Sequence, residues 1–191
     1  MKLQDLCKNL YKKKTLTDYI IYVSVLLAGI FIDQLTKWLV VENMYLYEHI
    51  PVIRIGDTVI ASLYRTTNDG AAFGMLDNAP WVFNTVSTVA IIAMLAYLFL
   101  GHADTKLSGI ALSMLISGGI GNMIDRLSLH YVVDFIYFDI INFAVFNGAD
   151  SFVCVGAGLL VLALILEMKQ EIKKEKLSKE ESARAIDEDE E

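Results

Sequence analysis

Four long apolar segments constrain the fold of this chain more than any other feature of its sequence. A helix of about 20 predominantly apolar residues crosses the hydrocarbon core of a bilayer. The second and third segments carry no charged residue, and the first contains only Asp33 and Lys37. A chain that is 55% hydrophobic, with a mean hydropathy of +0.48, is therefore predicted to be a small polytopic membrane protein. The four predicted membrane segments are residues 19–41, 79–101, 107–124 and 147–166.

The N-terminus admits two interpretations. Residues 1–18 are polar and contain five lysines, and a basic start before an apolar run is also the pattern of a cleaved signal peptide. No A-x-A cleavage site follows the run, and apolar residues resume after Lys37. We therefore expect residues 1–18 to form a cytoplasmic N-terminal segment and residues 19–41 to remain as an uncleaved membrane helix.

Lysine and arginine are concentrated at the two ends of the chain. The N-terminal flank has five and the charged tail, residues 167–191, has six, against two in residues 42–79 and one in residues 125–150. Because cytoplasmic segments are enriched in these residues, both termini are predicted to be cytoplasmic. The net charge of −7 gives no reason to expect nucleic-acid binding. The tail suggests no chemistry of its own.

Two regions outside the bilayer are predicted, residues 42–78 and 125–146. The first contains two short strand-like runs around Gly56-Asp57, a pair that favours a hairpin turn. The second is β-branched and aromatic enough to be extended or to lie at the membrane interface. Cys7 and Cys154 fall on opposite sides of the membrane in this topology, so no disulfide between them is expected, and neither has metal-ligand spacing.

Polar residues from separate stretches of the chain are predicted to lie at one membrane depth. Carboxylates embedded in membrane-like sequence are costly and are functional-site candidates by default. In the predicted topology they converge on the outer surface, which scattered structural residues would not be expected to do. The residues are Asp33, Lys37, Asn68, Asn122, Asp125, Arg126, Asp134, Asn147 and Asp150.

Carboxylate chemistry is the option that remains for this cluster. The histidines are scattered at positions 49, 102 and 130, and neither a serine-nucleophile motif nor a zinc motif occurs. Two carboxylates that share a site do not both ionise easily, so one keeps a proton and the other is a base. Such a pair activates water against a peptide carbonyl and protonates the leaving amine. No metal site is predicted.

Structural explanations compete with catalytic ones for each motif. Asp33 and Lys37, four residues apart on one helix, could be a structural ion pair. Asn68 could belong to a turn. The segment 122–126 could be a helix end with an Asp–Arg pair. Asp134 is desolvated by its apolar neighbours along the chain, whereas Asp150 could be a helix N-cap, so a catalytic role stays open for both.

The order of five motifs resembles the bacterial lipoprotein signal peptidases (signal peptidase II), which are aspartic peptidases. The resemblance covers roughly residues 19–166, and each motif alone is weak. The motifs are DQLTK, NDGAAFG, GGIGNMIDR, VVDF and FNGAD, in that order. The implied fold is an all-α membrane protein with four transmembrane helices and a small extracytoplasmic β-cradle.

The resemblance also implies roles and partners. The catalytic dyad would be Asp134 and Asp150. The substrate would be a prolipoprotein whose cysteine carries diacylglycerol, cleaved just before that cysteine at the outer face of the plasma or inner membrane. No cofactor is implied, globomycin-type inhibitors and membrane lipids are expected ligands, and we expect a monomer. Supporting residues would be Asp33, Lys37, Asn68, Gly70, Asn122, Asp125, Arg126 and Asn147.

Two other classes of protein were weighed. A proton- or cation-coupled transporter would also use intramembrane carboxylates, but near mid-membrane and at broken helices. A non-catalytic membrane subunit would assemble through the small residues of 107–124. The sequence leaves open which prolipoproteins are preferred, which aspartate holds the shared proton, and whether the host has an outer membrane.

Overall fold

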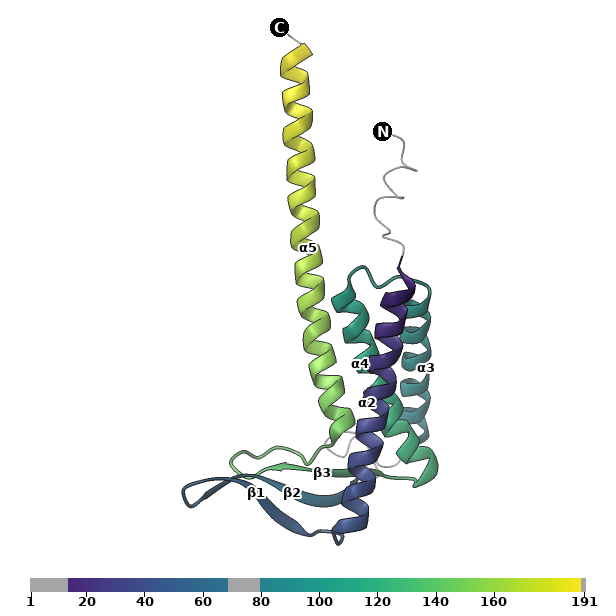
Figure 1. Cartoon of the computed structure of the whole chain (residues 1–191), viewed down its shortest axis with the longest axis vertical. Coiled ribbons are helices and arrows are strands. Elements are labelled where there is room, and N and C mark those ends of the chain that lie inside the picture. Colours follow the sequence, from purple (N-terminus) through teal and green to yellow (C-terminus); the bar gives the residue numbers. More distant parts are fainter. Residues whose placement is uncertain (1–13, 69–79, 190–191) are drawn as a thin grey trace.

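Helices and a small sheet make up the computed structural model, which describes residues 14–68 and 80–189, without the side chains of 80–83 and 178–189. The helices lie side by side and the sheet extends across one end of the bundle, while α5 continues far beyond the other end (Figure 1). In chain order the elements are α2 (Leu16–Asn43), β1 (His49–Ile55), β2 (Thr58–Asn68), α3 (Pro80–Phe99), α4 (Lys106–Ser128), β3 (Val132–Phe138) and α5 (Gly148–Asp189).

Capping boxes start α2 and α4. The hydroxyl of Thr15 accepts the backbone N–H of Asp18 at 3.3 Å, and the Asp18 carboxylate accepts the backbone N–H of Thr15 at 2.9 Å. Thr105 and Ser108 exchange the same pair of bonds at the start of α4. Such boxes satisfy N–H groups that a helix leaves without internal partners, which is why these two helices begin at Leu16 and Lys106.

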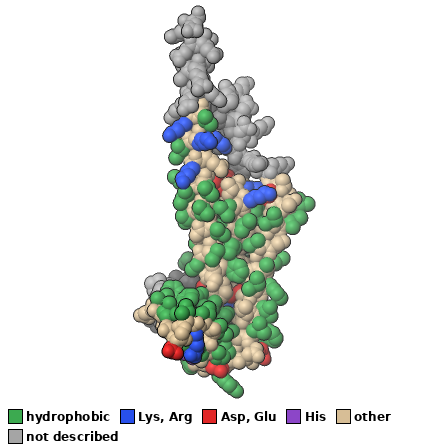
Figure 2. Space-filling view, turned by 60° about the vertical axis from the view of Figure 1, so that its left-hand side comes forward, with side chains coloured by type: hydrophobic (Ala, Val, Ile, Leu, Met, Phe, Trp, Pro, Cys, Tyr) green, Lys and Arg blue, Asp and Glu red, His purple; other side chains and the backbone are tan. Residues whose placement is uncertain are grey.

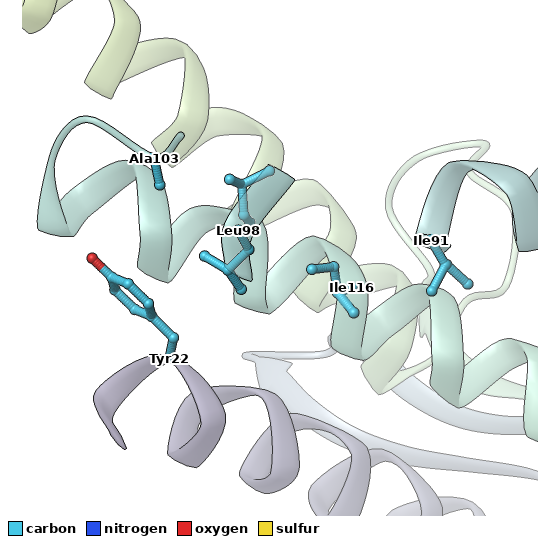
Figure 3. Close-up of a cluster of buried hydrophobic side chains, with 6 residues drawn as sticks. Tyr22, Ile91, Leu98, Ala103 and Ile116 are labelled. Atoms are coloured by element: carbon cyan, nitrogen blue, oxygen red, sulfur yellow. The ribbon is translucent and has the colours of Figure 1, made fainter. Parts of the chain in front are cut away.

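Small residues let α4 pack closely against its neighbours, and α4 contacts α2, α3 and α5. A Cβ added at Gly118 would lie 2.3 Å from the backbone oxygen of Ala149 on α5, and one at Gly109 would lie 2.2 Å from the ring of Tyr22 on α2. The close approach buries an apolar cluster away from the sheet (Figure 3). Its buried members are Tyr22, Ile91, Leu98, Ala103, Leu112 and Ile116.

The bundle presents an apolar outer surface, as Figure 2 shows over the helices. By length and composition, three of the described helices are able to cross a membrane: Leu16–Asn43, Lys106–Ser128 and Gly148–Leu177. The apolar part of α3, Asn84–Phe99, is shorter. The prediction of a mostly helical membrane protein with a small β-unit is therefore confirmed, although the protein is not all-α, since it contains a three-stranded sheet.

Some element boundaries differ from the sequence-based ones. Helix α4 continues to Ser128, beyond the predicted membrane segment 107–124, so Asp125 and Arg126 lie in the end of a helix, one of the interpretations considered for 122–126. His130, with φ of 70°, then turns the chain toward β3. Helix α5 runs on through most of the charged tail as a single helix to Asp189. In each case the helix continues beyond the uncharged run that predicted the membrane segment, because most charged residues are also good helix formers.

The sheet is antiparallel with the order β1-β2-β3. Its hairpin turns at Gly56, whose φ of 58° is readily adopted by glycine. Between Leu63 and Thr66 the register of β2 on β3 shifts, so that Thr66 faces Asp134 and Asn68 faces Val132. Asn68 and Asp134 are therefore diagonal neighbours on one face of the sheet, within reach of each other's side chains.

The sheet is attached to the end of α2. Val40 and Met44 of α2 pack against Val133 and Phe135 of β3. From β2, the guanidinium of Arg65 donates to the backbone oxygens of Val41, at 3.1 Å, and of Met44. A cation at a helix C-terminus compensates the partial negative charge of the last carbonyl groups. These contacts set where β3, and with it Asp134, stands relative to the bundle.

We predict that Gly118→Ala destabilises the protein by about 1–3 kcal/mol, the usual cost of overpacking a close contact. The added methyl group would meet the Ala149 backbone, which moves only if α4 and α5 separate. The measurement is the midpoint of thermal unfolding in detergent.

Gly158→Ala on α5 is the matched control, because a Cβ there has no neighbour within 4 Å. Alanine is the better helix former, so this variant should unfold at the wild-type temperature or slightly above it. Equal losses in the two variants would show that close contact is not what Gly118 provides.

Candidate active site

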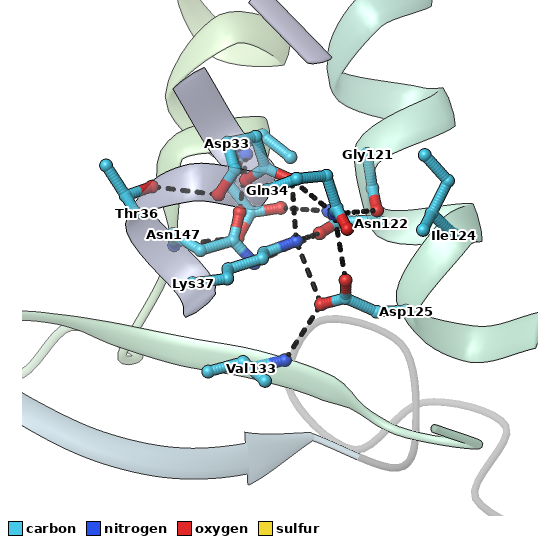
Figure 4. Close-up of polar contacts among 12 residues, drawn as sticks. Asp33, Gln34, Thr36, Lys37, Gly121, Asn122, Ile124, Asp125, Val133 and Asn147 are labelled. Atoms are coloured by element: carbon cyan, nitrogen blue, oxygen red, sulfur yellow. Dashed lines mark hydrogen bonds and ion pairs between the residues drawn. The ribbon is translucent and has the colours of Figure 1, made fainter. Parts of the chain in front are cut away.

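A cluster of buried polar side chains lies where the bundle meets the sheet. Its members come from α2, α4, β3 and the first turn of α5, and Figure 4 shows most of them converging on one region. Buried charges persist only when they are paired and hydrogen-bonded. The buried members are Asp33, Lys37, Asp125, Asp134 and Asn147.

Lys37 is at the centre of the cluster and is 3% exposed. Its ammonium lies 2.9 Å from Asp33 Oδ2 and 3.0 Å from Asp125 Oδ2, and donates to Asn122 Oδ1 at 2.9 Å. Three acceptors match the three N–H groups of an ammonium. The structural ion pair that we considered for Asp33 and Lys37 thus exists, and it extends to α4.

The two carboxylates beside Lys37 also accept hydrogen bonds from backbone N–H groups. Asp33 Oδ1 accepts the N–H of Ala149 at 2.7 Å, in the first turn of α5. Asp125 Oδ2 accepts the N–H of Val133 at 3.1 Å, in β3. One charged cluster therefore positions both segments that carry the candidate dyad, because Ala149 precedes Asp150 and Val133 precedes Asp134.

Gln34 belongs to the same cluster, and the sequence interpretation missed it. Its Nε2 is 3.2 Å from Asp33 Oδ2, 3.0 Å from Asp125 Oδ1 and 3.1 Å from the Gly121 carbonyl oxygen. The available signal was its place one helical turn before Lys37 inside DQLTK, which directs it to the same helix face.

Two asparagines connect the ion cluster to the carboxylates. The Asn147 amide donates to Asn122 Oδ1 at 3.0 Å and to Asp134 Oδ1 at 2.7 Å. The Asn122 amide donates to Asp150 Oδ1 at 2.8 Å. Asp134 and Asp150, 16 positions apart in the chain, are thus joined through two side chains.

Asp150 occupies the third position of a capping box that begins α5. Asn147 Oδ1 accepts the Asp150 N–H at 3.0 Å, and Asp150 Oδ2 accepts the Asn147 N–H at 3.1 Å. The N-cap considered from sequence is therefore Asn147, and Asp150 is its partner within the first turn. The motif FNGAD therefore forms the start of α5 and fixes the Asp150 carboxylate there.

Asp134 is buried on β3 between Val133 and Phe135, which are also buried. Asn68 donates to its Oδ2 at 3.0 Å, so the expectation that Asn68 belongs to the polar cluster agrees with the geometry. Burial raises the pKa of Asp134 to about 6; the charge of Asp150 acts in the same direction, and the bonds from Asn68 and Asn147 oppose it. A carboxyl with such a pKa is suited to proton transfer near neutral pH.

The structure brings most of the predicted site residues together. Arg126 lies one turn beyond Asn122 on α4 and donates to its backbone oxygen at 3.4 Å. Gly70 lies outside the described residues. Among the described residues, no group of three or more His, Cys, Asp or Glu side chains is placed to hold a metal ion. The residues brought into one connected cluster are Asp33, Lys37, Asn68, Asn122, Asp125, Asp134, Asn147 and Asp150.

Comparisons with known proteins identify similar sequences and structures. The family model for signal peptidase (SPase) II matches residues 25–166. A lipoprotein signal peptidase of Halalkalibacterium halodurans is 41% identical over 160 residues, which is 82% of this chain and 98% of that protein.

Two solved structures described as bacterial membrane enzymes, determined in meso at 2.3 and 1.9 Å, are also similar. Each is 30% identical, with TM-scores of 0.71 and 0.66; the matches cover 84% and 81% of this chain and 94% and 96% of theirs. With the family model covering most of the chain and a relative of this identity matched over nearly its whole length, the chain belongs to the signal peptidase II family.

Proposed function

We propose that the chain is a membrane aspartic endopeptidase that removes the signal peptide from diacylglyceryl-modified prolipoproteins. Cleavage is before the lipidated cysteine, and Asp134 and Asp150 form the catalytic dyad. The observation that carries this proposal is the joining of two carboxylates, through Asn122 and Asn147, at one end of an apolar bundle. Family membership supplies the class of reaction.

The two aspartates and one water molecule account for every proton transferred in the hydrolysis, so no cofactor is needed. The ionised aspartate takes a proton from water as the water oxygen bonds to the scissile carbonyl carbon, and the neutral aspartate protonates the carbonyl oxygen. The first aspartate then gives its proton to the leaving nitrogen as the C–N bond breaks. The second recovers a proton from the tetrahedral intermediate, which restores both carboxyl groups.

The position of the site favours a lipidated substrate over a transported ion. The cluster lies at the end of the bundle that carries the sheet, so an acyl chain could stay in the bilayer while the peptide reaches the dyad (Figure 1). A transporter would require its carboxylates near mid-membrane. Asp33, Lys37 and Asp125 hold the scaffold, and Asn68 and Asn147 hold Asp134. Gly70 and Arg126 are assigned to substrate binding or support of the dyad.

The topology completes the proposal. α3 is the fourth membrane span, both termini are cytoplasmic, and the sheet and dyad are at the outer surface of the plasma or inner membrane. The enzyme functions as a monomer among membrane lipids and is inhibited by globomycin-type peptides.

We predict that Asp134→Asn and Asp150→Asn each lower cleavage of a diacylglyceryl prolipoprotein by at least about 100-fold, the usual contribution of one general acid or base. The measurement is the rate of signal-peptide release by purified enzyme in detergent, with each variant shown to be folded. Asp57→Asn, in the exposed hairpin turn, is the control and should cleave at the wild-type rate. Full activity in either dyad variant would remove the assignment.

Asn68→Ala should shift the pH profile of kcat/KM upward. The bond from Asn68 favours the ionised form of Asp134, so its loss raises the pKa of that carboxyl further. The limb that reports Asp134 then moves to higher pH. Thr67→Ala, whose side chain points to the opposite face of β2, should leave the profile in place. A limb that stays in place or moves to lower pH in Asn68→Ala would contradict the claim that the Asn68 bond favours the ionised form of Asp134.

Single-cysteine labelling checks the topology in a Cys7→Ser/Cys154→Ser background. A membrane-impermeant maleimide should label Asp57→Cys in spheroplasts, but Asp104→Cys and Lys173→Cys only after the membrane is opened. All three positions are exposed. Labelling of Asp104→Cys from outside would show that α3 does not cross the membrane.

A further inference from the structure

Lys37 determines which way the Asn122 amide faces. An ammonium donates and never accepts, so the group that meets it at 2.9 Å on Asn122 must be the amide oxygen. The NH₂ group of Asn122 is then the atom that meets Asp150 Oδ1 at 2.8 Å. Lys37 itself is buried and satisfied by three acceptors, so its hydrogen-bonded connection to the dyad runs through Asn122.

A second donor-only group fixes Asn147. The backbone N–H of Asp150 meets the side-chain oxygen of Asn147 at 3.0 Å, which directs the Asn147 NH₂ group to Asn122 Oδ1 and Asp134 Oδ1. The Asn122 oxygen thus receives donors from both Lys37 and Asn147. Both amides are oriented by groups that have no alternative hydrogen-bonding role.

The two aspartates meet different surroundings as a result. Asp150 accepts from the Asn122 amide and from a backbone N–H, and it lies in the first turn of α5, where the helix dipole favours negative charge. Asp134 is buried between apolar neighbours on β3. Asp134 also accepts from Asn68 and Asn147, and the cations Lys37 and Arg126 are close enough to interact with it, but burial outweighs these effects and raises the pKa of this carboxyl.

We infer that Asn122, oriented by Lys37, is a positioning residue that holds Asp150 as the water-activating carboxylate, so that Asp134 carries the shared proton at rest. The inference rests on the proposed function and adds the division of labour within the dyad. In the reaction above, Asp150 takes the proton from water and Asp134 protonates the carbonyl oxygen.

The first test compares Asn122→Leu with Gln34→Leu. Both remove an amide of similar size from the same cluster, but the Gln34 amide bonds Asp33 and Asp125 and not Asp150. Asn122→Leu should lower kcat/KM roughly 10–100-fold, the effect of one hydrogen bond to a charged group, and should move the acidic limb of its pH profile to higher pH. Gln34→Leu should leave that limb at the wild-type position.

The second test examines orientation by Lys37. Lys37→Arg retains a cation that only donates hydrogen bonds. The acidic limb of its pH profile should therefore stay at the wild-type position. Lys37→Met removes one of the two donors to the Asn122 oxygen and leaves the Asn147 amide as the other, so it should move the limb in the same direction as Asn122→Leu but by less. The double variant should move the limb no further than Asn122→Leu alone. If Lys37→Met does not fold, Lys37→Arg decides: a moved limb in folded Lys37→Arg would overturn the orientation argument.

Infrared difference spectra identify the proton directly. The band of a protonated carboxyl in the resting wild-type enzyme should be absent in Asp134→Asn and present in Asp150→Asn; the opposite pattern would overturn the assignment. An unmoved acidic limb in Asn122→Leu would also overturn it, even where both aspartates prove essential for cleavage. Failure of the wild-type enzyme to cleave would instead refute the proposed function.

Discussion

The buried ammonium of Lys37 is the interaction on which the rest of the site depends. It pairs with the buried carboxylates of Asp33 and Asp125, and those carboxylates in turn hold the start of α5 and the strand β3. Removing one partner of a buried pair leaves an uncompensated charge, which costs more than the pair itself contributes. A charge cluster that would be a weak source of stability elsewhere here connects four elements, α2, α4, α5 and β3.

Helix initiation and proposed catalysis use the same atoms. The backbone N–H groups that open α5 need acceptors, and Asp33, Asn147 and the chain itself supply them. The capping box that satisfies these groups also fixes the Asp150 carboxylate. The rigid end of the helix therefore holds this site residue in place. Side chains held in this way lose little freedom when a substrate binds, which is the advantage of preorganisation.

The sheet brings Asp134 to this helix end and encloses it. Strand β3 packs against Val40 of α2 and Met44, which follows that helix, and it pairs with β2, whose register places Asn68 diagonally opposite Asp134. Enclosure of this kind explains the raised pKa of Asp134, because removal of water penalises the charged carboxyl more than the neutral one. The same enclosure strengthens every hydrogen bond that the site makes.

Sequence by itself determined the apolar helices, the hairpin turn at Gly56 and the gathering of polar residues at one end of the bundle, because hydrophobic period and turn chemistry are local. Tertiary structure alone decided that Gln34 bonds Asp125 and that Lys37 faces the oxygen of Asn122. These are contacts between residues far apart in the chain. Their geometry depends on glycine-mediated helix spacing and on strand register, neither of which a local pattern encodes.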